Sequence, residues 1–452
     1  MSGPYAGRSV LVAGAGVSGA AVARALLAMD ATVLVADQRA GERTAELERA
    51  GARFIGLPAE PPSGVDLVVV SPGWRPDDPL LTAAERAGLP VIGEVELAWR
   101  HRDPAIPWLA VTGTNGKTTT TLMLESILRA AGRRTVAAGN VGVPLIEVSA
   151  GNYDVLAVEL GSPQLHSAPS LLPLAGTVLN LAPDHLDWHG SFDAYAEAKR
   201  RVYAGDVAVL NVADEWSVRL AQGHPRQVGF TLADPDPGQL GCADGVLLDR
   251  AFGDAAAGVA LATVADIGVP GPHNVANALA AAALARVYGV PPEAVAAGLR
   301  TFRPAPHRNA LVSTVDGVDY VDDSKATNPH AASASLAAYE RVVWIAGGLL
   351  KGVAVDDFVA AISRRLVAVV LLGADRARLA EALARHAPDV PVTEVTRTDN
   401  GAMDEVVAHA AGYAAAGDTV LLAPAAASWD MFTDYTARGR AFAAAVAGLG
   451  RR

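Results

Sequence analysis

The first hundred residues alternate short apolar runs with alanine-rich segments that also carry charged residues. The apolar runs are "SVLVA" (9–13), "TVLVAD" (32–37), "DLVVVS" (66–71) and "PVIGE" (90–94). Runs of this length that are rich in Val and Leu are typical of buried strands, and the segments between them have the length and composition of helices. Strands that alternate with helices predict a parallel α/β sheet over this part of the chain.

Two further series of the same kind follow. The second contains "WLAVTG" (108–113), "TVAAGN" (135–140), "DVLAVEL" (154–160), "GTVLNL" (176–181) and "VAVLN" (207–211). The third contains "VDYVDDS" (318–324), "RVVWIAGG" (341–348), "AVVLLGA" (368–374) and "TVLLAPA" (419–425). Proline-containing joints separate the series, which predicts three α/β domains over residues 1–100, 101–304 and 305–452. Residues 230–266 are rich in Gly, Asp and Pro, and we expect them to form hairpins or loops within the second domain.

Composition narrows the class of protein without naming a function. The 452 residues suit about three domains of roughly 150 residues. A net charge of -11 argues against broad nucleic-acid binding, which needs a basic face. The single cysteine, Cys242, excludes an intramolecular disulfide and fits a reducing compartment. We see neither a signal peptide nor an apolar span of roughly 20 residues, so we expect a cytoplasmic monomer without membrane insertion.

The sequence "GAGVSG" (14–19) lies between the first apolar run and the first helical segment. It fits the G-x-G-x-x-G pattern of a dinucleotide-binding turn, and Asp37 stands about where an acidic ribose ligand would belong. Asp37 could equally be a polar residue at the end of a strand. Since this pattern is weak by itself, these residues leave open whether the protein is a nicotinamide-dependent oxidoreductase.

The second domain carries a more specific motif, "GTNGKTT", with a strand before it and a helix after it. Backbone N–H groups of such a turn cradle phosphate, Lys117 adds a cation for the outer phosphates, and Thr118 offers a hydroxyl to Mg²⁺. The longer P-loop pattern has a glycine where Val111 stands, so only the shorter core is present. An Asn-Gly turn before an ordinary helix would not explain the lysine and threonines. We therefore predict a nucleoside triphosphate site at Gly113, Thr114, Asn115, Gly116, Lys117, Thr118 and Thr119.

At "GTNGKTT" the chain resembles the Mur ligases, ATP-dependent amide-forming enzymes of peptidoglycan precursor synthesis. The resemblance extends over nearly the whole chain. It includes "AGNVGVP" (138–144), "HNVANALAA" (273–281), "FRPAPHR" (302–308), "DDSKATNP" (322–329), "LLAPAAASWDMF" (421–432) and "RGRAF" (438–442). The stretch "DDSKATNP" resembles the sequence at the same place in one branch of the family. That branch adds D-glutamate to UDP-N-acetylmuramoyl-L-alanine.

The resemblance implies a Rossmann-like uridine-nucleotide domain, a central P-loop ATPase domain with a parallel sheet, and a C-terminal Rossmann-like α/β domain. The last would bind the amino acid and close on ATP. The implied reaction passes through an acyl phosphate and uses ATP and two Mg²⁺ ions, with no NAD. The turn at residues 14–19 would then hold a diphosphate at a helix N-terminus instead of a redox cofactor.

The resemblance also implies the residues that bind each substrate. For the sugar nucleotide these are Val17, Ser18, Asp37, Gln38, Ser71, Gly73, Asn140 and His185. For ATP they are the P-loop together with Asn274, Asn277, Arg308 and Asp323. For the amino acid they are Lys325, Thr327, Lys351, Ser428 and Tyr435.

The catalytic residues that the resemblance implies are Lys117, Glu159, His185, Lys199 and Lys325. The implied metal ligands are Thr118, Glu159, His185 and Lys199. Lys199 would need to be carbamylated, because an ammonium group would repel Mg²⁺. Asp184, Asp187 and His189 lie near enough in sequence to be alternative ligands. We expect His307 to support the joint between domains or the γ-phosphate side and not to act as a base.

Three positions depart from the family pattern. Pro163 in "GSPQL" stands where an aromatic residue is common, Leu350 precedes Lys351 where a small or acidic residue is expected, and Tyr435 stands where Phe is common. The last two bear on D-glutamate specificity, so another Mur ligase or a folylpolyglutamate synthetase-like ligase stays an alternative. An inactive ligand-binding homologue is a further one, although the joint presence of the lysines, glutamate and histidine above argues against it.

Overall fold

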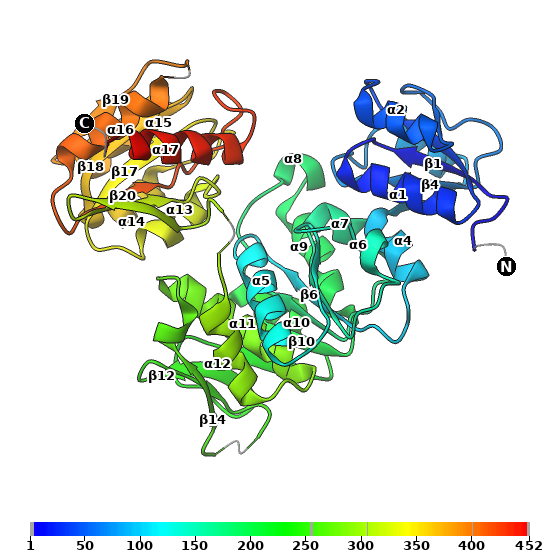
Figure 1. Cartoon of the computed structure of the whole chain (residues 1–452), viewed down its shortest axis with the longest axis horizontal. Helices are drawn as coiled ribbons and strands as arrows, with labels where there is room; N and C mark the ends of the chain where they lie inside the picture. The colour runs from blue at the N-terminus through cyan, green and yellow to red at the C-terminus, as the bar shows by residue number, and fades with distance from the viewer. Residues whose placement is uncertain (1–3, 254–255, 305, 400, 450–452) are drawn as a thin grey trace. The chain divides into compact units, whose positions relative to one another are not determined.

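The computed structural model describes residues 4–253, 256–304, 306–399 and 401–449 (Figure 1). The chain forms two compact units, Met1–Ile267 with Ala276–Phe302, and Gly268–Val275 with Arg303–Arg452. The first unit contains two sheets and the second contains one. The predicted boundaries at residues 100 and 304 stay predictions, and residue 305, the predicted start of the third domain, lies outside the described residues.

The first sheet is parallel, with the strand order β3-β2-β1-β4-β5. Its strands are β1 (Ser9–Ala13), β2 (Thr32–Ala36), β3 (Arg53–Phe54), β4 (Leu67–Val70) and β5 (Val91–Gly93). Its helices are α1 (Val17–Ala28), α2 (Glu42–Arg49), α3 (Pro79–Arg86) and α4 (Glu94–His101). The strand order reverses between β1 and β4, and in open α/β sheets ligands bind beyond the carboxyl ends of strands at such a point.

The central sheet has nine strands in the order β14-β13-β12-β11-β10-β9-β6-β8-β7. They are β6 (Trp108–Thr112), β7 (Ala137–Gly139), β8 (Leu156–Glu159), β9 (Ala175–Val178), β10 (Val207–Asn211), β11 (Gln227–Phe230), β12 (Gln239–Ala243), β13 (Val246–Asp249) and β14 (Val259–Thr263). The prediction of a parallel sheet holds for the strands up to β12 and is wrong for the edge, where β12, β13 and β14 pair antiparallel. Asp244 and Gly245 both have positive φ between β12 and β13, the conformation of a tight hairpin turn. Of the hairpins or loops expected over residues 230–266, the structure shows a hairpin between β12 and β13; residues 254 and 255 lie outside the described residues.

The helices of the central region are α5 (Lys117–Ala130), α6 (Leu145–Val148), α7 (Ser162–His166), α8 (Leu186–His189), α9 (Phe192–Arg200), α10 (Glu215–Ala221), α11 (Pro272–Val287) and α12 (Pro292–Thr301). Two 3₁₀ turns, η1 (Arg201–Ala204) and η2 (Val264–Ile267), lie among them.

The sheet of the second unit has six strands in the order β15-β16-β20-β17-β18-β19, all parallel except β15. The strands are β15 (Ala310–Val315), β16 (Val318–Asp322), β17 (Val342–Gly347), β18 (Leu366–Leu372), β19 (Val392–Glu394) and β20 (Thr419–Leu422). The helices are α13 (Pro329–Leu336), α14 (Asp356–Ile362), α15 (Arg376–His386), α16 (Ala402–Tyr413) and α17 (Tyr435–Leu449), with the 3₁₀ turn η3 (Ser363–Arg365). Every strand predicted from an apolar run is present, and outside residues 231–266 the strands β3, β11, β15 and β19 are additional.

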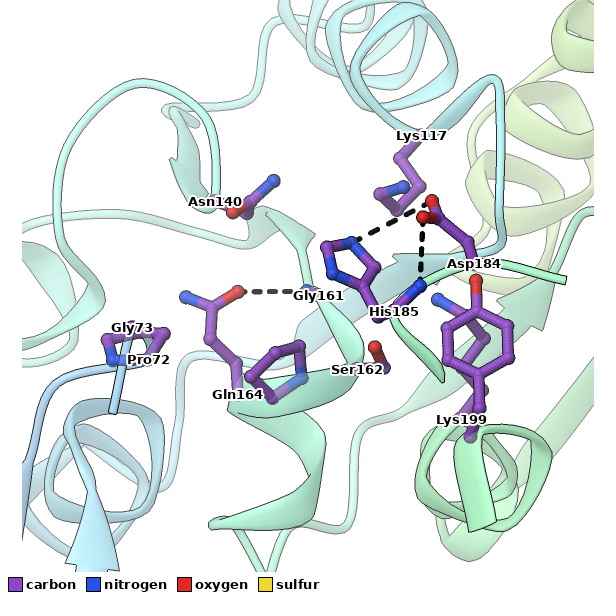
Figure 2. A pocket seen from close by; sticks show the side chains of 12 residues that line it. Pro72, Gly73, Lys117, Asn140, Gly161, Ser162, Gln164, Asp184, His185 and Lys199 are labelled. Carbon is purple, nitrogen blue, oxygen red and sulfur yellow. Dashed lines mark hydrogen bonds and ion pairs between the residues drawn. The ribbon is translucent and has the colours of Figure 1, made fainter. Parts of the chain in front are cut away.

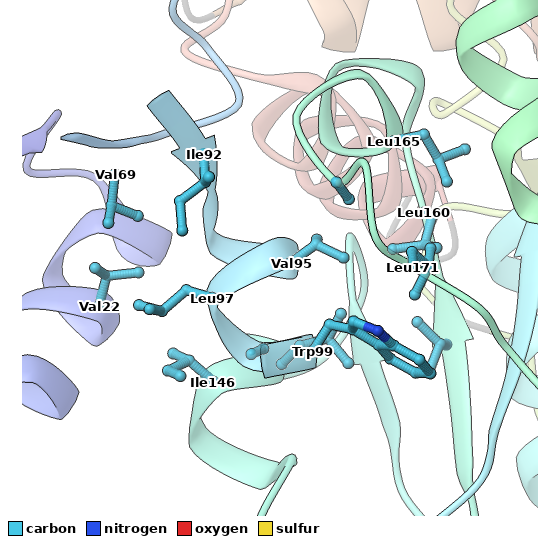
Figure 3. Packing of buried hydrophobic residues seen from close by; sticks show 14 of the residues in the cluster. Val22, Val69, Ile92, Val95, Leu97, Trp99, Ile146, Leu160, Leu165 and Leu171 are labelled. Carbon is cyan, nitrogen blue, oxygen red and sulfur yellow. The ribbon is translucent and has the colours of Figure 1, made fainter. Parts of the chain in front are cut away.

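Helix α4 joins the two sheets of the first unit into one hydrophobic core (Figure 3). Leu97 of α4 packs in this cluster with Val22 and Ile146, and all three side chains are buried. Burying side chains of this size contributes about 1.5–3 kcal/mol each. Two buried glutamates at the start of α4 add polar contacts: Glu94 accepts a hydrogen bond from the backbone N–H of Ile146 (2.8 Å), and Glu96 accepts one from that of Ser170 (3.0 Å). None of the described helices is long and apolar enough to cross a membrane.

Candidate active site

The predicted phosphate loop connects β6 to α5. Gly113 and Gly116 have positive φ values of 149° and 85°. A Cβ atom on Gly116 would lie 2.4 Å from the side-chain oxygen of Asn277, so both the backbone conformation and the available space require glycine. The Lys117 ammonium bends back over the loop and donates to the carbonyl oxygens of Gly113 and Thr114, both at 2.9 Å. The loop therefore has the shape that its sequence predicted, with its lysine beside the turn.

Asn180 holds this loop in place, although the sequence did not single it out. Its side-chain oxygen accepts from the backbone N–H of Asn115 at 2.9 Å, and its side-chain nitrogen donates to the Asn115 carbonyl at 3.1 Å. Asn180 follows β9, which is the neighbour of β6 in the sheet. Adjacent parallel strands end at the same edge, and this rule combined with "GTVLNL" is the signal that could have found it.

The first predicted metal ligands lie behind the loop. Glu159 ends β8, and its carboxylate is almost fully buried, with 1% of the residue exposed. One carboxylate oxygen accepts from the Thr118 hydroxyl and the other from the Asn140 side-chain amide, both at 2.7 Å. A hydroxyl beside a carboxylate is the hard-oxygen donor set that Mg²⁺ prefers, so these residues fit the predicted ion. The described residues contain no group of three or more His, Cys, Asp or Glu able to hold a metal. An ion here would therefore also need water or phosphate oxygens, as Mg²⁺ commonly does.

Lys199 lies on α9 with its ammonium buried beneath the phosphate loop. It donates to the carbonyl oxygen of Gly113 at 2.9 Å and to the Thr112 hydroxyl at 3.2 Å. Burial lowers the pKa of Lys199 well below its ordinary value, and the nearby charge of Lys117 lowers it further. Lys199 is therefore not a surface lysine, since only 1% of the residue is exposed.

Tyr195 is a second residue that the sequence reading missed. Its hydroxyl forms a 2.9 Å hydrogen bond with that of Thr114, and its ring lies 4.8 Å from the Lys199 ammonium. Burial raises the pKa of the Tyr195 phenol, so it stays protonated. Because residues four apart share a helix face, the spacing to Lys199 could have indicated Tyr195.

A cavity of about 250 Å³ joins these groups to the first sheet (Figure 2). Figure 2 shows Pro72 and Gly73 on one side, Lys117 and Lys199 on the other, and His185 between them. The lining residues are Pro72, Gly73, Lys117, Asn140, Gly161, Ser162, Pro163, Gln164, Asp184, His185, Tyr195 and Lys199. The cavity thus brings together five of the predicted site residues, and it does not include Val17, Ser18, Asp37, Gln38 or Ser71.

His185 has an unusual backbone for a non-glycine residue, with φ of 51°. Its backbone N–H donates to Asp184 at 2.9 Å, and its ring Nε2 lies 3.7 Å from the other carboxylate oxygen. Of the alternative ligands, Asp184 lines the cavity, whereas His189 pairs instead with the Ser162 hydroxyl at 2.9 Å. Asp187 is exposed. The His185 imidazole and the Asp184 carboxylate therefore form part of the polar lining of the cavity.

The glycine-rich turn lies at the switch point of the first sheet. The Asp37 carboxylate already accepts a hydrogen bond within the protein, from the backbone N–H of Ala15 at 2.7 Å. A Cβ on Gly19 would lie 1.8 Å from the carbonyl oxygen of Gly14, so the close approach of α1 to the turn requires glycine. Val17 and Gln38 are exposed, and Ser18 is half-buried. The first turn of α1 carries no acidic side chain, which leaves its positive end suited to an anion.

The second unit places its predicted residues at the carboxyl ends of its strands. The Lys325 ammonium lies 3.9 Å from the centre of the Tyr435 ring, and Lys351, with φ of 53°, lies 4.4 Å from that of the exposed Trp429. Ser428 is buried in the loop after β20, and the Thr327 backbone N–H donates to the Lys325 carbonyl at 2.8 Å. This unit therefore gathers cations and hydroxyl groups, as a dicarboxylate ligand would need.

Other predicted groups of this unit lie at the end of β16. Burial raises the pKa of the Asp323 carboxyl to about 6, against the opposing effect of Arg308. His307 contacts Asp322, with 2.6 Å between its Nδ1 and the carboxylate; its predicted support of the joint or of the γ-phosphate side stays a prediction. Asn274 lies apart from β16, on α11, and its side-chain nitrogen donates to the Pro270 carbonyl at 2.7 Å.

Arg438 is the first residue of the motif "RGRAF". Its buried guanidinium donates to the Ser324 carbonyl at 2.9 Å and to the Ala426 carbonyl at 3.1 Å. It therefore ties the loop after β16, which carries Lys325, to the loop after β20, which carries Ser428.

Comparison with known proteins identifies the family. Residues 8–93 match "Mur ligase MurD-like, N-terminal domain", residues 111–285 match "Mur ligase middle domain", and residues 307–426 match "Mur ligase, glutamate ligase domain". The UDP-N-acetylmuramoylalanine–D-glutamate ligase of Streptomyces avermitilis is 57% identical and covers 99% of both chains, and that of Thermobifida fusca is 58% identical over 98% of this chain and 99% of the relative.

Solved structures share the fold at low identity. The UDP-N-acetylmuramate-alanine ligase MurC from Thermotoga maritima matches with a TM-score of 0.60 at 20% identity, over 98% of this chain and 99% of that one. MurF from Acinetobacter baumannii matches with a TM-score of 0.61 at 18% identity, over 93% and 91%. Together, the three matching family models and the relatives that are more than half identical over nearly the whole chain show that the chain belongs to the Mur ligase family.

Proposed function

We propose that this protein is the ATP-dependent ligase that joins D-glutamate to UDP-N-acetylmuramoyl-L-alanine in peptidoglycan precursor synthesis. Relatives that are more than half identical over nearly the whole length are UDP-N-acetylmuramoylalanine–D-glutamate ligases, which supports this substrate pair. The observation that carries the proposal is the cavity that joins Lys117 and Lys199, beneath the phosphate loop, to Gly73 of the first sheet. We further propose that it acts in the cytoplasm as a monomer, with domain boundaries near residues 100 and 304.

The reaction that these groups suit is the activation of a carboxylate by phosphoryl transfer. A carboxylate oxygen of the substrate's alanine attacks the γ-phosphorus of ATP, the bond from that phosphorus to the bridging oxygen breaks, and ADP leaves. The amine of D-glutamate, after losing a proton to water, attacks the acyl carbon, and phosphate leaves as the amide forms. Phosphoryl transfer needs positioning and charge neutralisation more than a protein nucleophile, and Lys117 with the loop N–H groups provides both.

Thr118 and Glu159 are the residues that would hold Mg²⁺ at the phosphates, with His185 and Lys199 holding a second ion. Such ions neutralise the charge that develops on the transferring phosphoryl group. Asn140 fixes the Glu159 carboxylate by its 2.7 Å hydrogen bond, so the acid is oriented before any ligand arrives. His185 would reach the cavity from its exposed loop.

We propose that Lys199 is carbamylated. Its lowered pKa favours the neutral amine, whose nitrogen can attack the carbon of CO₂ to form an N–C bond and release one proton. The product carries a carboxylate, which is a suitable ligand for a hard cation. The neighbouring ammonium of Lys117 favours an anion at this place.

The remaining assignments follow the three substrates. For the sugar nucleotide we propose Val17, Ser18, Asp37, Gln38, Ser71, Gly73, Asn140 and His185; for ATP, residues 113–119, Asn274, Asn277, Arg308 and Asp323; and for D-glutamate, Lys325, Thr327, Lys351, Ser428 and Tyr435. The close approach of Asn277 to Gly116 supports the second group. The pairing of Lys325 with Tyr435 supports the third.

An isotope experiment tests the proposed chemistry. UDP-N-acetylmuramoyl-L-alanine labelled with ¹⁸O in the alanine carboxylate is incubated with ATP, Mg²⁺ and D-glutamate, and the released phosphate is analysed by mass spectrometry. An acyl phosphate predicts one ¹⁸O atom in each phosphate, and Lys117→Ala is expected to abolish its release. Unlabelled phosphate formed together with the amide product would contradict the proposal.

A further inference from the structure

Helix α8 follows His185 directly and is a short helix on the protein surface. It contains only four residues, and none of them is buried. Backbone hydrogen bonds from Trp188 (3.1 Å) and His189 (3.0 Å) to the His185 carbonyl make His185 part of the same short turn. The position of the His185 ring therefore depends on whatever holds α8 in place.

Side-chain contacts supply this attachment. The indole N–H of Trp188 donates to the backbone carbonyl of Trp74 at 3.0 Å, and the His189 ring pairs with Ser162 at 2.9 Å. The Trp188 ring also meets the His166 ring edge to face, with ring centres 5.2 Å apart. Only the Trp188 contact reaches the first sheet, since the other two partners belong to the loop and helix after β8.

The Trp74 end of this contact lies at the glycine-rich turn. Its indole nitrogen would be 2.9 Å from a Cβ built on Gly14, so the ring rests directly on the turn. The backbone N–H of Trp74 donates to the Ser71 carbonyl at 3.1 Å, and the adjacent Gly73 lines the same cavity as His185. The loop whose carbonyl Trp188 binds is therefore in direct contact with the glycine-rich turn.

The contact is not needed to hold the two sheets together. Helix α4 already does this through a shared buried core and through the hydrogen bonds of Glu94 and Glu96. A single hydrogen bond at a partly exposed site adds little to that attachment. Its specific consequence is to link the loop at 71–74 to the turn that carries His185.

We propose that Trp188 is a positioning residue that couples sugar-nucleotide binding at the glycine-rich turn to the placement of His185. This inference rests on the proposed function of His185 and of the turn. Ligand binding would restrict the 71–74 loop, and the Trp188 hydrogen bond would restrict α8 in turn. By reciprocity, a group held by His185 would tighten sugar-nucleotide binding by the same factor. One hydrogen bond of ordinary strength corresponds to a factor of about 2 to 10.

The test compares wild type with Trp188→Phe, which keeps a ring but removes the N–H donor. Trp188→His is the rescue variant, because its Nε2 lies the same number of bonds from Cβ as the indole nitrogen. Trp216→Phe is the matched control, since that half-buried ring packs on Phe192 and lies far in sequence from both contacts. Thermal midpoints are measured for all variants to compare their folding.

The first readout uses neither metal nor ATP. UDP is titrated while hydrogen exchange of the backbone amides of residues 185–190 is followed by mass spectrometry, and its dissociation constant is measured by calorimetry. We expect UDP to slow this exchange in wild type and Trp216→Phe and to slow it much less in Trp188→Phe, with UDP affinity retained. Equal slowing of exchange in Trp188→Phe and wild type would overturn the inference.

The second readout is the Mg²⁺ concentration that gives half-maximal phosphate release. In wild type it should fall about 2- to 10-fold as UDP-N-acetylmuramoyl-L-alanine goes from subsaturating to saturating. Trp188→Phe should lose this dependence, and Trp188→His should recover part of it, while the KM for ATP stays constant. Equal dependence in Trp188→Phe and Trp216→Phe would overturn the coupling. If wild type released no phosphate with D-glutamate, the proposed function would fail, and the hydrogen-exchange readout would still decide the Trp188 link.

Discussion

Glu94 makes a prediction about how stability depends on pH. It is the first residue of α4, only 2% of it is exposed, and one of its carboxylate oxygens accepts from the Ile146 N–H at 2.8 Å. Its other carboxylate oxygen has no hydrogen-bond partner among the described residues. Burial raises the pKa of Glu94 from 4.5 to about 7. The folded protein therefore keeps a proton here that the unfolded chain loses at lower pH.

The sign and size of the effect follow from this difference. Between pH 4.5 and 7 the folded state binds more protons at Glu94 than the unfolded state, so stability falls as pH rises through this range. Above pH 7 the full cost is present, on the order of 3 kcal/mol, because one pKa unit corresponds to about 1.4 kcal/mol. Glu94→Gln imitates the protonated form at every pH and removes this dependence. Its stability relative to wild type should therefore improve by about 3 kcal/mol between pH 4.5 and pH 8.

Urea unfolding followed by tryptophan emission at pH 4.5, 5.5, 6.5, 7.5 and 8.0 measures this difference. Glu60→Gln is the control, because Glu60 is exposed and reports what the same change does at the surface. We expect the Glu94→Gln curve to move upward relative to wild type with increasing pH, while the control stays parallel to wild type. A constant difference between Glu94→Gln and wild type over the whole range would refute the reasoning.

Three further predictions concern the site. Asn180→Ala removes both hydrogen bonds to Asn115, so the KM for ATP should rise about tenfold in steady-state kinetics, with little change in the KM for D-glutamate. Equal changes in both KM values would contradict the role of Asn180 at the phosphate loop. Wild type incubated with ¹³C-bicarbonate should show a carbamate carbon signal by NMR that Lys199→Ala lacks, and identical spectra would exclude the modification. Arg438→Met breaks the link between the loops after β16 and β20, so the KM for D-glutamate should rise more than tenfold while UDP affinity stays constant. An unaltered KM for D-glutamate would show that this link is not needed for binding the amino acid.

Much of the fold could be predicted because its signals are local. Buried parallel strands require continuous apolar runs such as "LVVV" and "VVWIAG", and the phosphate loop requires glycines at positions that its backbone geometry dictates. Edge strands such as β15 and β19 are only partly buried and therefore lack that pattern. The sequence predicted the antiparallel strands β12–β14 only as a turn-rich segment. Their short runs show little alternation of apolar and polar residues.

The site was predicted less completely, for a physical reason. Lys117, Glu159 and Lys199 stand in motifs, whereas Asn180, Tyr195 and Trp188 act through contacts between segments far apart in the sequence. A single sequence does not show the order of the strands in a sheet, and therefore not which strand ends lie side by side. Burial of Lys199 is likewise a tertiary property, because α9 alone would suit a surface lysine as well as a buried one.

The central claim is the identity of the acceptor, and one measurement tests it most directly. Phosphate release from ATP is followed with UDP-N-acetylmuramoyl-L-alanine and, in parallel, D-glutamate, L-glutamate, glycine, L-lysine or no amino acid. The account predicts release that depends on D-glutamate alone and yields the amide product. Release supported equally by another amino acid, or by none, would contradict it.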